Sequence, residues 1–281
     1  MSVKTEIGIF CGDRRHIHLT RALLQKGYSV NTYCLPENVR EEGCTASSSL
    51  EELVLCCRFL IGPIPFTKDS EQALLDLPCL LNKNHFLSGG MIPPDLVGFC
   101  KNQKIPCYDL MKNEKIAILN AIATAEGSIM EAILTGDSNL HKSSCLVLGY
   151  GRCARILAGK LKGLDAIVTV AARSEEALAF AQASGLRSIH LSDKTNLLPE
   201  FDFIFNTIPA LVLDQDCLAL LKPETVIIDI ASAPGGIDYD YAMRRGLKAK
   251  LCPGLPGKIS PKSSADILAN EIILLMKEGI P

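Results

Sequence analysis

Short apolar runs separated by mixed polar stretches characterise the first 110 residues of the chain. Apolar runs of roughly four to eight residues, bounded by turn signals, are typical of strands buried inside a parallel sheet. The predicted strands of this half are residues 5–11, 28–34, 58–62, 78–82 and 104–110. Helical or loop stretches separate them, so the pattern predicts an α/β domain whose parallel sheet is covered on both faces.

Residues 112–135 show a different period. Apolar side chains recur there at steps of three and four, at Ile118, Ile122, Ala125, Ile129 and Ile133. This spacing indicates one long helix. A second stripe of the same helix is small and polar, with Asn120, Thr124 and Gly127. We interpret the helix as the connection between two domains, with its polar stripe facing a cleft.

A second alternation of strands and helices follows. Its predicted strands lie within residues 145–152, 166–173, 187–192, 201–209, 225–232 and 247–254, and the first of these segments ends in a turn. Six strands over about 110 residues match a complete Rossmann unit. Ser260 followed by Pro261 is typical of a helix start, and we expect the last helix, at about 261–278, to pack back on the first domain. The expected divisions are residues 1–115, a connecting helix at 116–140, a Rossmann domain at 141–260 and a final helix at 261–281.

Composition narrows the functional classes. Among 281 residues, 29 Lys and Arg nearly balance 31 Asp and Glu, and the net charge of −2 argues against a nucleic-acid partner. No run reaches the ~18 apolar residues of a membrane span, and no signal peptide is expected. The 12 Cys contain no C-x-x-C pair, which favours free thiols in a reducing cytosol. His16 and His18 diverge on a helix, so we expect no metal site.

The first strand of the second half ends in a glycine-rich turn of the form G-x-G-x-x-A. The first glycine permits a tight turn, the second lets backbone amides approach a pyrophosphate, and the alanine allows close helix packing. The residues expected to contact the nucleotide here are Gly149, Tyr150, Gly151, Arg152 and Cys153, before Ala154. The sequence therefore predicts two doubly wound parallel-sheet domains, an N-terminal flavodoxin- or Rossmann-like substrate domain and a C-terminal NAD(P)-binding Rossmann domain.

The end of the next strand bears on which nucleotide binds. An acidic residue there would hold the ribose of NAD, but the chain has Arg173 and Ser174, with no carboxylate before Glu175. A guanidinium and a hydroxyl fit a 2′-phosphate, which favours NADP. If Arg173 only stacks on adenine, NAD binds as well. Later strand ends supply the other expected cofactor contacts, Thr207, Ile208, Pro209 and Ser232.

With these residues in place, the chain resembles the family formed by the A subunits of dipicolinate synthase. The resemblance rests on the segments LVLGYGR, AARS, FNTIPALVL, IIDIASAPGGIDY and LCPGLPGKISPKSSADILAN, and on the N-x-x-x-T-x-E-G pattern of Asn120, Thr124, Glu126 and Gly127. It covers essentially the whole chain, is most specific in the C-terminal half, and is weaker between about 35 and 110.

The resemblance implies an oxidoreductase acting on CH–CH donors. Its expected reaction oxidises dihydrodipicolinate, derived from 4-hydroxy-tetrahydrodipicolinate, to dipicolinate during sporulation, with NAD(P)⁺ accepting the hydride. It also implies that the partner is the flavoprotein-like B subunit of dipicolinate synthase and that the location is the cytoplasm of the mother cell. It leaves a homo-oligomer open.

A cyclic dicarboxylate substrate requires cations or helix N-termini for its carboxylates and a proton acceptor. Arg15, in the first turn after the first strand, is the preferred carboxylate ligand, whereas Arg14 is equally well explained as solvated. The alternative for Arg15 is a surface cap with Asp13 and no ligand. Lys262 lies in the first turn of the last helix, which suggests a local anion or carboxylate, or else a solvated lysine.

The polar stripe of the connecting helix supplies the remaining candidates. Asn120 and Thr124 lie one turn apart and either hydrogen-bond the substrate or nicotinamide, or form a packing contact between domains. Glu126 is either the proton acceptor or a bridge between domains. Two other functions stay open: a different two-domain dehydrogenase of the shikimate or methylene-tetrahydrofolate type, and an NADP-binding protein without turnover.

Overall fold

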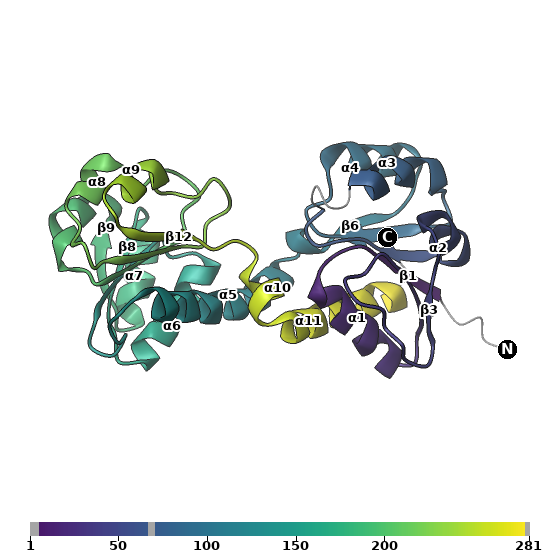
Figure 1. Ribbon diagram of the computed structural model, residues 1–281, viewed down its shortest axis with the longest axis horizontal. Coiled ribbons are helices and arrows are strands. Elements are labelled where there is room, and N and C mark those ends of the chain that lie inside the picture. Colours follow the sequence, from purple (N-terminus) through teal and green to yellow (C-terminus); the bar gives the residue numbers. More distant parts are fainter. Residues whose placement is uncertain (1–5, 67–70, 279–281) are drawn as a thin grey trace. The chain divides into compact units, whose positions relative to one another are not determined.

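The computed structural model describes residues 6–66 and 71–278, and it divides the chain into two compact units. Unit 1 comprises Met1–Asn120 and Ser260–Pro281, and unit 2 comprises Ala121–Ile259. Each unit contains one six-stranded sheet in which every described pairing of strands is parallel (Figure 1).

Unit 1 alternates strands and helices along the chain. Its strands are β1 (Glu6–Phe10), β2 (Ser29–Tyr33), β3 (Cys44–Ala46), β4 (Phe59–Ile61), β5 (Phe86–Gly89) and β6 (Cys107–Asp109). Its helices are α1 (Arg14–Gln25), α2 (Leu50–Cys56), α3 (Glu71–Leu80), α4 (Pro94–Asn102), the 3-10 turn η2 (Leu110–Lys112), the start of α5 (Glu114–Thr135) and α11 (Pro261–Glu278). The strand order β3-β2-β1-β4-β5-β6 reverses between β1 and β4, which is where ligands bind in open α/β sheets.

Unit 2 repeats the same order of strands. The strands are β7 (Ser144–Leu148), β8 (Ile167–Ala172), β9 (Arg187–His190), β10 (Phe203–Asn206), β11 (Val226–Asp229) and β12 (Lys248–Leu251). The helices are α6 (Arg152–Gly163), α7 (Glu175–Ala183), the 3-10 segment η3 (Leu191–Glu200), α8 (Gln215–Ala219), α9 (Tyr239–Arg244) and α10 (Leu255–Ile259). The order β12-β11-β10-β7-β8-β9 has its switch point between β7 and β10.

Both faces of the unit 2 sheet are buried. Side chains of a strand alternate between the faces, so Phe203 and Phe205 of β10 enter one core and Ile204 enters the other. Val147 and Leu148 of β7 divide in the same way. This explains why the strands read as continuous apolar runs, and it confirms the predicted doubly wound class.

One predicted strand of unit 1 is wrong. The sequence predicts a strand at residues 78–82, but the last turns of α3 include Pro78. Ala73, Leu77 and Leu81 are buried at steps of four, so the run presents a helical face to the core, and that burial outweighs the cost of an internal proline. The sequence pattern does not predict strands β3 and β5, which are three and four residues long. The predicted first strand begins at residue 5, which lies outside the described residues.

One long helix crosses between the two units, and the last helix belongs to unit 1. The predicted long helix is α5, which starts in unit 1 and continues into unit 2, where Ala125 and Ala132 are fully buried. Within the described ranges, α5 is the one helix long and apolar enough to span a membrane, a test that core helices also pass. The last helix, α11, begins at Pro261 as predicted and packs beside α1 within unit 1 (Figure 1).

Candidate functional site

The turn after β7 requires glycine at its first position. Gly149 has φ of +93°, and a Cβ there would lie 2.5 Å from the side-chain oxygen of Thr207. Its amide donates to the carbonyl oxygen of Ala171 at 2.8 Å, and the Thr207 hydroxyl donates to the carbonyl oxygen of Leu148 at 2.8 Å. The backbone therefore turns sharply at the switch point of the sheet, against the end of β10.

Helix α6 begins directly after this turn with no side-chain cap. Its N-cap residue is Gly151, and a Cβ at that position would meet nothing within 4 Å. The first amides of a helix point out of its end without intrahelical partners and carry the positive end of the helix dipole. Open space in front of uncapped amides is the arrangement that binds phosphate groups.

Unit 1 has a similar glycine turn, but the helix that follows it is capped by a side chain. Gly12 also has positive φ, at +98°, but the next residue, Asp13, accepts a hydrogen bond from the Arg15 amide at 2.9 Å and caps α1. The amide of Asp13 donates to Nδ1 of His16 at 3.2 Å, which completes a capping box. Unit 1 thus holds its own carboxylate at the start of its helix, whereas the equivalent start of α6 in unit 2 has no side-chain cap.

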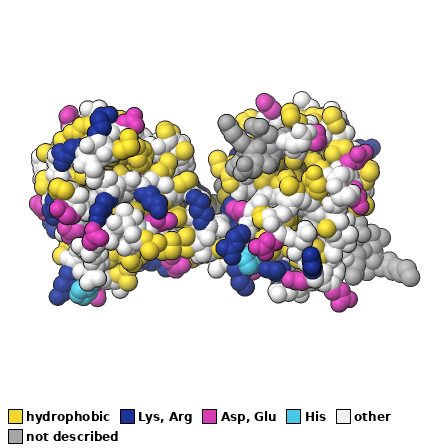
Figure 2. Space-filling model, viewed as in Figure 1, with side chains coloured by type: hydrophobic (Ala, Val, Ile, Leu, Met, Phe, Trp, Pro, Cys, Tyr) yellow, Lys and Arg dark blue, Asp and Glu magenta, His cyan; other side chains and the backbone are white. Residues whose placement is uncertain are grey.

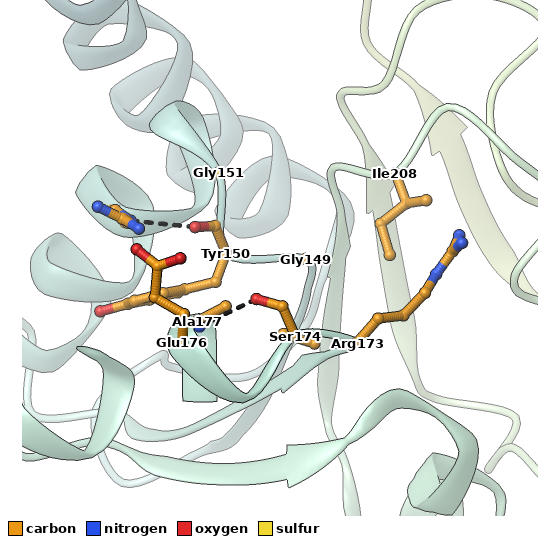
Figure 3. Close-up of a pocket in the computed structure, with 10 residues that line it drawn as sticks. Gly149, Tyr150, Gly151, Arg173, Ser174, Glu176, Ala177 and Ile208 are labelled. Atoms are coloured by element: carbon orange, nitrogen blue, oxygen red, sulfur yellow. Dashed lines mark hydrogen bonds between the residues drawn. The ribbon is translucent and has the colours of Figure 1, made fainter. Parts of the chain in front are cut away.

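A cavity of about 400 Å³ opens in front of α6. It lies between the glycine turn and the start of α7, as Figure 3 shows, and its lining residues are Gly149, Tyr150, Gly151, Arg155, Ala172, Arg173, Ser174, Glu176, Ala177 and Ile208. Arg173 extends toward Ile208, while Glu176 lies beside Tyr150 (Figure 3). The hydroxyl of Ser174 accepts from the Ala177 amide at 3.1 Å and keeps its own proton for donation.

Two charged residues of this cavity are not among the sequence candidates. Nε of Arg155 donates to the Tyr150 carbonyl oxygen at 3.1 Å, and its guanidinium lies 4.8 Å from the Phe180 ring centre and 5.4 Å from that of Tyr150. Glu176 brings a carboxylate to the same cavity. A usable signal exists for Arg155, because it directly follows the G-x-G-x-x-A motif on the helix that the motif opens.

The other predicted cofactor residues lie around the turn. Arg152 and Cys153 form the first turn of α6, and burial raises the pKa of the half-buried Cys153 thiol. Pro209 and Ser232 are exposed in the loops that follow β10 and β11. All of these positions are at the carboxyl edge of the unit 2 sheet.

The ionisable substrate candidates each have a partner within their own unit. Nε and Nη2 of Arg15 bind the Asp13 carboxylate at 2.7 to 3.0 Å, and Nη2 also donates to the Ile64 carbonyl oxygen. Glu126 accepts from Nζ of Lys160 at 2.8 Å.

Lys262 binds Asp266 at 2.8 Å, one turn along α11, and so has the local carboxylate that its position suggests. Asn120 and Thr124 are both half-buried on α5, and the boundary between the units falls just after Asn120.

A larger cavity, of about 500 Å³, lies between α3 and α4 of unit 1. Hydrophobic side chains are frequent on the upper surface of the right-hand unit in Figure 2. The described lining of the cavity is Leu74, Leu75, Pro78, Pro93, Asp95 and Leu96. Among these described residues Asp95 is the one ionisable side chain. The cavity before α6, by contrast, is lined by Arg155, Arg173 and Glu176 beside an uncapped helix start, so it is the better candidate for chemistry.

Comparison with known proteins indicates the family to which the chain is similar. The family model for the N-terminal domain of the dipicolinate synthase A subunit matches residues 6–111. The A subunit of dipicolinate synthase from Bacillus subtilis (strain 168) is 42% identical over 142 residues, which make up 50% of this chain and 48% of that relative. That match spans about half the length of the relative.

Two crystal structures are similar along nearly the whole chain. The A subunit of dipicolinate synthase from Bacillus halodurans is 30% identical, with a TM-score of 0.87 and 100% coverage of both chains. The dipicolinate synthase A chain from Bacillus subtilis is also 30% identical, with a TM-score of 0.84 and coverage of 99% of this chain and 97% of that one. The similarity therefore extends over both sheets.

Proposed function

Because this chain belongs to the family of dipicolinate synthase A subunits, we propose that it oxidises dihydrodipicolinate to dipicolinate with a nicotinamide nucleotide as hydride acceptor. The substrate gives up a hydride and a proton, and its ring becomes aromatic, which supplies driving force. The protein's task is then to hold the ring against the acceptor and to remove one proton.

The observation that carries this proposal is the uncapped start of α6 behind the Gly149 turn. The positive φ of Gly149, the open space at Gly151 and the cavity of about 400 Å³ all fit a dinucleotide whose pyrophosphate meets the helix amides. When bound, the nucleotide supplies the hydride acceptor. The protein contributes its placement at the carboxyl edge of the sheet, at the switch point between β7 and β10.

We propose NADP as the preferred nucleotide, with NAD as the alternative. Arg173 and Ser174 follow β8, where the adenosine ribose of a dinucleotide lies in Rossmann domains, and Arg155 adds a second guanidinium to the same cavity. Two cations favour a 2′-phosphate, which carries up to two negative charges. The negative charge of Glu176 disfavours a 2′-phosphate, and its carboxylate is suited to accept hydrogen bonds from ribose hydroxyls.

For the cyclic dicarboxylate we retain Arg15, Asn120, Thr124, Glu126 and Lys262 as proposed ligands or proton acceptors. The ion pairs in the structure define what each role would require. Glu126 would have to leave Lys160 to accept a proton, and Lys262 would have to leave Asp266 to bind a carboxylate. Both pairs are exposed, so such exchanges cost little.

Assembly and location follow from the family as further proposals. A family of A subunits implies a second polypeptide, the B subunit of dipicolinate synthase, which we propose to be flavoprotein-like. The cytoplasm of the mother cell of a spore-former is the proposed setting. Homo-oligomer formation is compatible with this proposal.

A coupled assay tests the function. Aspartate semialdehyde and pyruvate are passed through the preceding synthase, and the protein is added with NADP⁺ or NAD⁺, with and without its proposed flavoprotein-like partner. The proposal predicts dipicolinate absorbance together with an equal amount of reduced nucleotide. Dipicolinate without nucleotide reduction would remove the redox assignment, and nucleotide binding without turnover in either arm would favour a non-catalytic role.

A further inference from the structure

A buried carboxylate joins the ends of β10 and β11. Asp229 is the last residue of β11, has no exposed surface, and pairs in register with Asn206, the last residue of β10. Its Oδ1 accepts from Nδ2 of Asn206 and from the Ala231 amide, both at 2.9 Å. Its Oδ2 accepts from the Gly236 amide at 2.7 Å and from the Tyr239 hydroxyl at 2.9 Å.

The residue type matches this set of partners closely. An ionised carboxylate is purely an acceptor with about four lone-pair sites, and four donors occupy them here. An amide in its place would point an NH₂ group at two of those donors. Burial, together with the hydrogen bond to Asp229, raises the pKa of Tyr239 above its usual range, so the phenol remains a donor.

The network controls the backbone on both sides of the carboxylate. Asn206 holds Ile208 through both backbone groups, donating to its carbonyl oxygen and accepting from its amide, each at 3.0 Å. A Cβ on Gly235 would lie 2.6 Å from Oδ2 of Asp229, and one on Gly236 would lie 2.5 Å from Nδ2 of Asn206. The loop after β11 therefore packs closely against the side chains of Asn206 and Asp229. Asn206 also holds the backbone of Ile208, whose side chain lines the cavity.

Sheet order places this network on one half of the crevice. A dinucleotide lies across the switch point of a Rossmann sheet, with its two halves over opposite sides. Arg173 follows β8, on the side where the adenosine half belongs, whereas Asp229 ends β11 on the other side of β7 and β10. The loop after β11, with Ser232, therefore follows a strand on the nicotinamide side of the switch point, whereas Ile208 lines the cavity that also contains Arg173.

We propose that Asp229 is a positioning residue, which fixes the loop around Ser232 for the nicotinamide half of the nucleotide without touching it. This inference rests on the proposed function. The glycine motif and Arg173 account for binding of the diphosphate and the adenosine half. Asp229, Asn206 and Tyr239 would instead affect the affinity for the nicotinamide half.

The test compares a whole nucleotide with its adenosine half. Isothermal titration calorimetry measures NADP⁺ against adenosine 2′,5′-bisphosphate, and NAD⁺ against AMP, for wild type, Asp229→Asn and Tyr239→Phe. Asp238→Asn is the matched control, because Asp238 caps α9 and asparagine caps equally well. Thermal melts check that each variant is folded.

We expect Asp229→Asn to weaken the dinucleotide by about tenfold or more while the adenosine half changes by less than about twofold, because buried donors lose their acceptor. Tyr239→Phe should show the same selectivity with a smaller loss, and it decides the question if Asp229→Asn does not fold. Equal losses for both ligands, or no loss, would overturn the positioning role. Wild type binding neither dinucleotide would overturn the proposed function itself, and this inference with it.

Discussion

The side-chain oxygen of Thr207 lies 2.5 Å from the point that a Cβ on Gly149 would occupy. The Thr207 hydroxyl is itself held by the Leu148 carbonyl oxygen, so it cannot retreat without losing a hydrogen bond. This contact joins the end of β10 to the turn after β7. It makes the first glycine of the motif a requirement of packing as well as of backbone conformation.

Gly149→Ala is therefore expected to lower the free energy of unfolding by roughly 1–3 kcal/mol, because φ of +93° disfavours a side chain and Thr207 must move. Nucleotide affinity should fall with it. Gly159→Ala in α6 is the control, since a Cβ there meets nothing within 4 Å and alanine favours a helix by up to about 1 kcal/mol. Urea unfolding measures both, and a Gly149→Ala protein as stable as wild type would contradict the contact.

Reversing the charge at Arg173 tests the 2′-phosphate contact. Arg173→Asp should weaken NADP⁺ binding by about tenfold or more, because a charge-assisted hydrogen bond is replaced by repulsion, and should affect NAD⁺ much less. Arg244→Asp makes the same charge change on α9 as a control. Calorimetric titration gives both affinities, and equal losses for the two nucleotides would refute the contact.

Glu176 is expected to act in the opposite direction. Replacing it by glutamine removes a negative charge from the cavity and should strengthen NADP⁺ relative to NAD⁺ by a few-fold. Glu175 lies in the same first turn of α7 but is not among the residues lining this cavity, so Glu175→Gln is the matched control. The ratio of the two dissociation constants is the readout, and an identical shift in both variants would mean that Glu176 acts only through the general field.

The free energy of unfolding should depend on pH through the ionisation of Asp13. Burial opposes its ionisation, but the neighbouring His16 ring and the Arg15 guanidinium hold the pKa of Asp13 well below its usual range. A carboxyl with a depressed folded-state pKa stabilises fully above its unfolded value of about 3.9, and that stabilisation is lost as pH falls through the folded value. The stability difference between wild type and Asp13→Asn should be largest near neutral pH and shrink below about pH 4. Urea unfolding at several pH values checks this, and a difference independent of pH would exclude the linkage.

The features that the sequence predicts best are local. The glycine turn, the strand ends and the helix start at Pro261 depend on neighbouring residues, so periodicity and spacing locate them. The prediction for the run at 78–82 is wrong because a short apolar segment fits a strand or a helix equally well, and only the burial of Leu77 and Leu81 decides between them.

The features that the sequence does not predict depend on register and on distant partners. Asn206 and Asp229 are 23 positions apart and meet only because β10 and β11 pair with their ends level. Lys160, the partner of Glu126, is 34 positions away and is recognisable only once helix faces are known, whereas Asp266 lies one turn from Lys262 in the predicted last helix and is recognisable from spacing. Glu176 lies in the first turn of α7, and the strand-end pattern at Arg173 and Ser174 does not indicate which residues of the following helix line the cavity.

The most direct test is a crystal structure of the protein grown with NADP⁺ or NAD⁺. We predict a diphosphate against the amides at the start of α6, beside Gly149 and Gly151, with the adenosine ribose next to Arg173. Density for the nucleotide anywhere else on the chain, or a turn filled by the protein's own side chains with nucleotide present, would contradict it.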